Sequence, residues 1–389
     1  MFRTLLDPTA LWSPALAPLA GWSRLGDLLG RYLQAPHDLM ARTLAAVDTH
    51  GRTLEEVVRA DAPFEVRGGV VAATPFVRLI HLVGPAAGRR RFLLVAPASG
   101  YATAVISPLV TALLAQGEVV VTEWVDARLV PVGEGEFGLR EQIEAGLVGA
   151  MALGGPAHLV ALSQSGPTVL ALIGLLAERA PELLPSSATF LGCQLDPGVA
   201  PTMGQQLMAA LPRDLVVPQL TALVGPGYPG VGRRVYPAVL QLLGYSLASP
   251  QLYAEVQQGL WQELATGAGS VYQRLHADLH SLADVPAGLF IDMMGWMVTR
   301  DAWGPGGPRI AGASVDLAGL RALPVLTIEA GEDELIGRGQ THILPRRVPV
   351  GMAQAATLPG GRHHDLFTGP RFVAEVAPVL WRFFAAMEG

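Results

Sequence analysis

The sequence contains a single cysteine, Cys193, among 389 residues. One thiol excludes an internal disulfide and a zinc site built from several cysteines. Charged residues are also scarce, at 15% of the chain, and the formal net charge is −6. No cluster of basic residues alternates with aromatic residues. These deficits exclude a disulfide-stabilised scaffold and argue against a nucleic-acid partner.

Long uninterrupted hydrophobic segments are lacking as well. An aspartate and three prolines within the first 18 residues interrupt the apolar N-terminus, whereas a signal peptide needs a continuous apolar region. Residues 145–177 carry no charge and are long enough to cross a bilayer. Because glycine and proline interrupt them at 154–156 and 166–167, we favour a strand, a turn and a helix there over a transmembrane helix.

Half of the residues are hydrophobic, and they occur in alternating patterns. Five short, nearly continuous apolar runs are typical of strands buried on both faces. They lie at 92–97, 118–125, 157–162, 188–193 and 324–330. Helical patterns accompany them at 104–116, 140–154 and 166–180. The alternation predicts an α/β fold with a mostly parallel sheet flanked by helices.

The alternation also suggests how the chain is divided. We expect a helical N-terminal extension at 1–85 and the first part of an α/β core at 86–195. Residues 196–320 are rich in Pro, Gly, Tyr and amphipathic helix, which predicts a helical cap inserted over the sheet. The second part of the core follows at 321–389.

The turn after the third predicted strand reads Ala-Leu-Ser-Gln-Ser at 161–165. Small residues two positions before and after Ser163 are typical of a nucleophile elbow, where larger side chains would collide with backbone. The serine then lies at a helix N-terminus, and the N–H of Gln164 can face a developing oxyanion. Ser163 is therefore the candidate nucleophile.

Two other interpretations of this turn remain. Ser163 and Ser165 could simply cap the following helix. Alternatively, Ser165 could be the nucleophile, but Pro167 would then occupy a position that needs a small residue. We favour Ser163.

A nucleophilic serine needs a base and an acid, which in this architecture follow it in the order acid, then histidine. Asp333 lies just beyond the strand predicted at 324–330, and a double histidine lies in the glycine-rich loop at 359–364. We expect Asp333 as the acid and His363 as the base. Glu332 or Glu334 could replace Asp333.

The remaining candidate residues would contact the substrate. The loop after the first predicted strand offers small residues whose N–H groups could complete an oxyanion hole with Gln164, namely Ala98 or Ser99. Aromatic residues that could line an apolar groove are Tyr101, Tyr236, Tyr245 and Trp296. Aromatic residues in a cap are equally often part of the core.

Several longer stretches resemble the bacterial intracellular polyhydroxyalkanoate (polyhydroxybutyrate) depolymerases. They are LLVAPASGYAT at 93–103, VTEWVDARLVP at 121–131, YPGVGRRVYPAVLQLLGY at 228–245, LTIEAGEDELIGRGQT at 326–341 and GRHHDLFTG at 361–369. The resemblance covers nearly the whole chain. It implies an α/β-hydrolase fold with a cap, and cytoplasmic hydrolysis of stored polyester, with association with polyester granules.

Position by position, the resemblance carries the nucleophile to Ser163, the acid to Asp333 and the base to His363. One departure is that the family's turn begins with Cys-Gln-Pro, whereas this sequence has Ser163-Gln164-Ser165. No metal or cofactor is implied. In the blocks without a derived catalytic role, we expect Asp126 and Arg128 to form an ion pair, and Arg233 and Arg234 to anchor the cap.

The expected reaction is therefore hydrolysis of a hydroxyalkanoate ester through a Ser-His-Asp triad and an acyl-enzyme. One alternative is a carboxylesterase or lipase acting on small or medium-chain esters with the same residues. The other is a granule-binding protein on an inert hydrolase scaffold, against which the presence of Ser, Asp and His argues.

Overall fold

The computed structural model describes residues 53–98, 102–267, 269, 272–273, 276, 282–304, 307–315 and 317–387. The chain divides into two compact units, each described by itself. The larger consists of Arg52–Gln241 and Ala283–Gly389 and contains the main sheet. Of the other, the structure describes parts of Leu242–Leu282, chiefly helix α10 (Pro250–Thr266). The boundaries expected at 85, 195 and 320 remain predictions.

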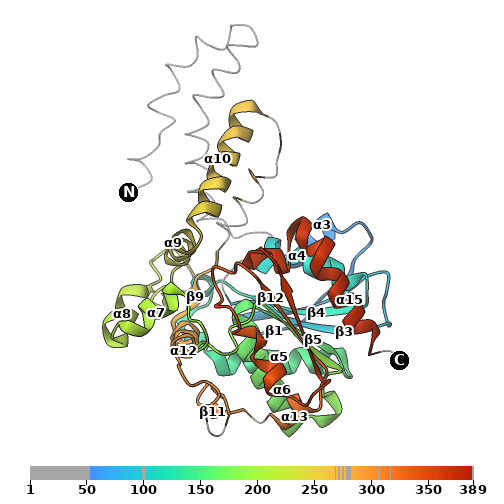
Figure 1. The fold of residues 1–389 in the computed structure, drawn as a ribbon. Coiled ribbons are helices and arrows are strands. Elements are labelled where there is room, and N and C mark those ends of the chain that lie inside the picture. Colours follow the sequence, from blue (N-terminus) through green and yellow to red (C-terminus); the bar gives the residue numbers. More distant parts are fainter. Residues whose placement is uncertain are drawn as a thin grey trace, which may run out of the picture. The chain divides into compact units, whose positions relative to one another are not determined.

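An eight-stranded sheet forms the centre of the larger unit (Figure 1). Its strands β2 and β4 pair antiparallel, as do β1 and β2, whereas all pairs from β4 to β13 are parallel. The strands, in spatial order, are β1 (Arg67–Ala73), β2 (Val77–Val83), β4 (Glu118–Trp124), β3 (Arg91–Val95), β5 (His158–Leu162), β6 (Ser187–Leu191), β12 (Val325–Ala330) and β13 (Ala353–Leu358).

Helices cover both faces of this sheet, with one group on each side in Figure 1. The first group is α3 (Leu54–Asp61), α4 (Ala102–Leu114) and α15 (Ala377–Ala385); the second is α5 (Leu139–Leu153), α6 (Gly166–Arg179) and α13 (Ala318–Arg321). Every residue of β5, β6 and β12 is buried, as expected of parallel strands that have helices on both faces. The sheet order and its helical layers confirm the predicted α/β-hydrolase fold.

A cap region lies between β6 and β12 in the sequence. In the larger unit it contains helices α7 (Met203–Ala210), α8 (Arg213–Leu220) and α12 (Ala287–Met297), and the start of α9 (Ala238–Ala248). A three-stranded sheet, β7 (Ala222–Leu223), β8 (Arg234–Tyr236) and β9 (Val285–Pro286), and a hairpin, β10 (Arg309–Ile310) with β11 (Ala313–Ser314), complete it. Among the described residues, no helix has the length and apolar character needed to span a bilayer.

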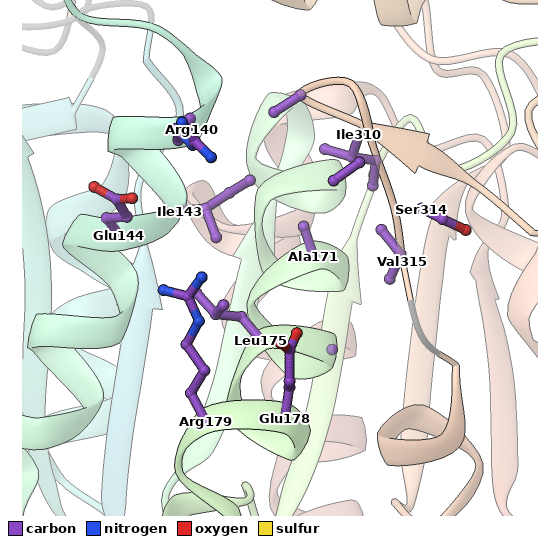
Figure 2. A pocket seen from close by; sticks show the side chains of 13 residues that line it. Arg140, Ile143, Glu144, Ala171, Leu175, Glu178, Arg179, Ile310, Ser314 and Val315 are labelled. Atoms are coloured by element: carbon purple, nitrogen blue, oxygen red, sulfur yellow. The ribbon is translucent and has the colours of Figure 1, made fainter.

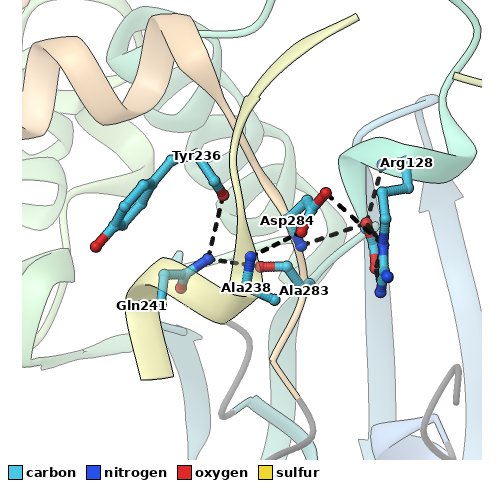
Figure 3. Close-up of polar contacts among 7 residues, drawn as sticks. Arg128, Tyr236, Ala238, Gln241, Ala283 and Asp284 are labelled. Atoms are coloured by element: carbon cyan, nitrogen blue, oxygen red, sulfur yellow. Dashed lines mark hydrogen bonds and ion pairs between the residues drawn. The ribbon is translucent and has the colours of Figure 1, made fainter. Parts of the chain in front are cut away.

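A polar network joins the segment after β4 to this cap (Figure 3). Arg128 and Asp126 form a partly buried ion pair at 2.6 Å, which confirms the expected pair at a strand end. Asp284 belongs to the same network. Its backbone N–H donates to the carboxylate of Asp126, and its Oδ1 accepts the N–H of Ala238 at 2.7 Å. Burial raises the pKa of Asp284, and the charge of Asp126 adds to that rise, while the Ala238 N–H and Arg128 oppose it.

Arg233 anchors the cap strand β8 to the core. Its side chain is buried and donates to the carbonyl oxygens of Val130, Pro131 and Gly135. The guanidinium also lies over the ring of Phe76, 4.8 Å from its centroid. A guanidinium offers five N–H donors in a fixed fork, so one side chain can fix three carbonyl groups of this loop.

Replacing Arg233 by methionine should lower the free energy of unfolding by about 3 kcal/mol, because three carbonyls lose their donors. Arg234, which was also expected to anchor the cap, is exposed and donates to the hydroxyl of Thr221 within the cap at 3.3 Å. It provides the control: Arg234→Met should change that free energy by no more than about 0.5 kcal/mol. Urea unfolding followed by circular dichroism measures both values. Equal values for the two variants would show that Arg233 does not anchor the cap.

Candidate functional site

Three predicted site residues, and one glycine that the sequence analysis did not predict, follow four neighbouring parallel strands. Ser163 comes directly after β5, Gly192 directly after β6, Asp333 shortly after β12 and His363 shortly after β13. These strands are adjacent in the sheet, in the order β5, β6, β12, β13. Their carboxyl ends therefore meet at one edge, which is where ligands bind in open α/β sheets.

Ser163 occupies a strained turn between β5 and α6. Its φ is +50°, a left-handed conformation that residues other than glycine seldom adopt. A single turn at Ser163–Ser165 leads into α6. The side chain is partly exposed. This is the geometry that presents a nucleophile at the end of a strand.

Ser165 has a different role in the same turn. It is fully buried, and its hydroxyl accepts the N–H of Leu162 at 2.8 Å and donates to the carbonyl of Leu162 at 2.9 Å. A hydroxyl engaged in both directions with the backbone is not available as a nucleophile. The small residue expected after the serine thus serves to close the turn.

Asp333 and His363 are in direct contact. His363 Nδ1 lies 2.8 Å from Asp333 Oδ2, and both side chains are almost completely buried. The other carboxylate oxygen of Asp333 accepts the N–H groups of Leu335 and Ile336. Glu334, an alternative acid in the sequence, instead accepts the backbone N–H of His363 at 3.3 Å. Asp333 is therefore the carboxylate that can orient the imidazole.

The pKa values of the two neighbouring histidines shift in opposite directions. Burial by itself lowers the pKa of His363, but the charge of Asp333, the hydrogen bond to it and the charge of Glu334 outweigh burial and raise that pKa. Burial and repulsion from His363 lower the pKa of His364 to about 3, against a weaker opposing effect of Asp333. His363 is consequently the histidine suited to take up a proton.

Gly192 and Cys193 pack against two of the predicted site residues, His363 and Ser163. The sequence analysis did not single them out for the site. Gly192 has a φ of +53°, and a Cβ there would lie 3.1 Å from Cε1 of the His363 ring, so only glycine fits without displacing the imidazole. The buried Cys193 thiol interacts with the backbone of Ser163, and burial raises its pKa well above the ordinary value. A glycine directly after a buried strand was the available signal.

The chain Gly192–Val199, here called the β6 extension, is held by cap tryptophans. Trp296 donates its indole N–H to the carbonyl of Gln194 at 2.7 Å, and Trp303 donates to that of Leu195 at 2.9 Å. The Trp296 side chain is only 4% exposed and packs in the main core. We expected Trp296 to line a substrate groove, but its side chain is instead buried, with the indole N–H donating to a backbone carbonyl.

Tyr236 keeps a partly exposed position in the cap. Its ring stacks on Phe290 with centroids 4.1 Å apart. Tyr245 lies on α9, in the smaller unit. Tyr101 lies outside the described residues.

Of the expected oxyanion donors, Gln164 and Ala98 are described. Gln164 follows Ser163 in the first turn, where helical N–H groups lack an intrahelical acceptor. Ala98 is buried after β3. Two bonds fix the chain just before it: Ala96 donates its N–H to Thr122 and accepts the indole N–H of Trp124, both at 2.9 Å. Ser99 lies outside the described residues.

A separate cavity of about 210 Å³ lies between α5, α6 and the β10–β11 hairpin (Figure 2). Its apolar lining includes Ile143, Leu175 and Val315, and two arginines and two glutamates surround it. None of the predicted site residues lines it. Within the described part of the chain, no cluster of three or more His, Cys, Asp or Glu residues is arranged to hold a metal ion.

Comparison with curated protein sequences gives no match. Solved structures with a similar chain path include a putative non-heme bromoperoxidase from Mycobacterium tuberculosis H37Rv, with 15% identity, a TM-score of 0.48, and coverage of 84% of this chain and 97% of the other. A putative lipase from Acinetobacter baumannii AYE has 14% identity, a TM-score of 0.46 and coverage of 87% and 99%. Carboxylesterase CesB from Bacillus subtilis has 13% identity, a TM-score of 0.46 and coverage of 90% and 99%. Proteins that share a fold at such identities differ widely in activity.

A family model gives more specific information. Residues 192–388 match the model described as PHB de-polymerase C-terminus. The match begins at Gly192, which packs against the ring of His363, and it includes the cap, Asp333 and the C-terminal helix. Since it spans just over half of the 389 residues, the chain belongs to the PHB depolymerase C-terminus family.

Proposed function

We propose that this protein hydrolyses the ester bonds of a polyhydroxybutyrate-like polyester, with Ser163 as nucleophile, His363 as base and Asp333 as the acid that orients it. The observation that carries the proposal is the buried contact of 2.8 Å between His363 and Asp333, at the sheet edge where Ser163 emerges. Membership of the PHB depolymerase C-terminus family supports the choice of substrate.

In this mechanism, Ser163 Oγ attacks the ester carbonyl carbon and gives its proton to Nε2 of His363. Asp333 faces Nδ1, so it fixes the tautomer that leaves Nε2 free to accept. The N–H groups of Gln164 and of Ala98 or Ser99 stabilise the oxyanion. As the ester C–O bond breaks, His363 gives its proton to the departing alkoxide oxygen, which leaves as an alcohol, and the acyl-enzyme remains.

Deacylation repeats these steps with water. His363 removes a proton from a water molecule, which attacks the acyl carbon; the protonated His363 then returns its proton to Ser163. The products are a carboxylic acid and an alcohol, so for a polyester each cycle cuts one chain into two. The polymer is expected to meet the enzyme at a granule surface in the cytoplasm.

The test is to compare two substrates: clearing of an amorphous polyhydroxybutyrate suspension, and hydrolysis of a soluble short-chain ester. Activity on both supports the proposal. Activity on the soluble ester alone favours a carboxylesterase of small or medium-chain esters. Binding to the suspension without hydrolysis of either substrate favours a granule-binding protein.

A pair of cap variants makes the substrate assignment sharper. Tyr236→Ala should lower polymer clearing about tenfold and leave soluble-ester hydrolysis within about twofold, because remote contacts position only a long substrate. Trp296→Phe should affect both substrates equally, since the lost indole N–H holds the β6 extension. Equal losses on both substrates for Tyr236→Ala would assign this residue to the core.

A further inference from the structure

Glu329 is a buried carboxylate for which the mechanism above has no use. It lies in β12, with only 4% of its surface exposed. Its Oε2 accepts the N–H of Gly339 at 2.9 Å, and its Oε1 accepts those of Thr341 at 2.8 Å and His342 at 3.0 Å. A buried charge is costly unless it is compensated. Here three backbone donors compensate it and in turn fix residues 339–342, which we call the Glu329 turn.

The loop that carries the acid is therefore held by a carboxylate at each end. At its start, Asp333 Oδ1 accepts the N–H groups of Leu335 and Ile336. At its end, Glu329 binds the Glu329 turn. The imidazole of His342 adds contacts to two hydroxyl groups, with Nδ1 2.9 Å from that of Thr327 and Nε2 3.2 Å from that of Thr357.

The other side of the Glu329 turn holds the β6 extension. The Thr341 hydroxyl donates to the carbonyl of Cys193 at 2.9 Å. Gln340 accepts the N–H of Asp196 on its backbone carbonyl and donates its side-chain amide to the carbonyl of Val199 at 2.9 Å. Three hydrogen bonds thus join the Glu329 turn to the β6 extension, so the position of the turn determines the position of the extension.

We infer that Glu329 is a positioning residue for His363, acting through the Glu329 turn and the β6 extension. The extension begins with Gly192, on which the His363 ring rests, and continues with Cys193, which lies against the backbone of Ser163. Loss of the Glu329 bonds would free the turn, then the extension and finally the position of the imidazole relative to Ser163. The inference rests on the proposed function, because it assigns His363 the role of base.

Glu329→Gln is the direct test. The amide has the size of the carboxylate, but its NH₂ group would face a backbone donor in place of an acceptor. On a soluble ester, kcat should fall about 10- to 100-fold with KM unchanged within about twofold, since small misplacement of a catalytic group costs rate. The low-field proton resonance of the His363 Nδ1–H, in its bond to Asp333, should also shift or broaden.

Leu326→Ala is the matched control, because Leu326 is fully buried on the same strand. It should lower stability while leaving kcat and the His363 resonance nearly unchanged at temperatures where the protein is folded. Equal loss of kcat in the two variants, or a rise in KM alone for Glu329→Gln, would overturn the positioning role. If the unmutated protein hydrolyses no ester, the proposed function fails, and the inference about Glu329 is then judged from the His363 Nδ1–H resonance alone. An unchanged resonance in Glu329→Gln refutes the inference, and an altered one supports it.

Discussion

Replacement of Ser163 by alanine should lower kcat/KM for a soluble ester by about a thousandfold or more, with no loss of folded structure. The reason is that Ser163 would form the acyl-enzyme, and no neighbouring group replaces it. Ser165→Ala is the control: it removes a hydroxyl two residues away that bonds to the backbone of Leu162. That change should reduce stability by about 1 kcal/mol and leave most of the activity.

Chemical labelling tests the same residue without mutation. A fluorophosphonate should inactivate the protein and label Ser163, whereas a thiol-alkylating reagent should leave it active. Cys193 is the only thiol, it is buried, and burial raises its pKa, so it presents almost no reactive thiolate. Inactivation by the thiol reagent, together with resistance to the fluorophosphonate, would refute the serine mechanism.

The second large effect concerns the base. His363→Ala should lower kcat about a thousandfold or more, whereas His364→Ala should keep it within about tenfold. With a pKa of about 3, His364 is neutral at working pH and a poor proton acceptor. If His364→Ala is the damaging change and His363→Ala is mild, the base is wrongly assigned.

Asp333→Asn adds a pH signature to this assignment. The base must be neutral to accept a proton, so activity falls as the pH drops through the pKa of His363. Asp333 raises that pKa against the effect of burial. Its replacement by asparagine should therefore shift the acid limb of the kcat/KM profile to lower pH, in addition to a loss of about a thousandfold or more. An unshifted limb would contradict the pairing.

Much of the fold could be predicted because its central strands have a clear local pattern. The five apolar runs correspond to β3, β4, β5, β6 and β12, all buried in the sheet. The strands of the eight-stranded sheet that the sequence did not indicate are β1, β2 and β13. Both edge strands, β1 and β13, are largely exposed and consist mainly of Gly, Ala and polar residues, so they lack the pattern that identifies a buried strand. As a result, the sheet begins inside the region expected to be a helical extension.

Some residues of the candidate site could likewise be predicted from the sequence, and others could not. Ser163, Asp333 and His363 are recognisable from order and local motif, because each follows a strand or lies in a glycine-rich loop. Gly192 and Glu329 are not, since their roles depend on contacts across the sheet edge: a glycine under a distant imidazole, and a carboxylate that binds a turn ten residues later. The burial of Trp296 likewise depends on where its helix packs, which no local pattern records.

The parallel pairing of β5, β6, β12 and β13 also has a consequence for folding. Ser163 and His363 are separated by roughly 200 residues, and they share one sheet edge only after β6 has paired with β12 and β12 with β13. Such non-local pairings carry a large loop-closure entropy and form slowly. During refolding, helical circular dichroism should therefore return before enzymatic activity.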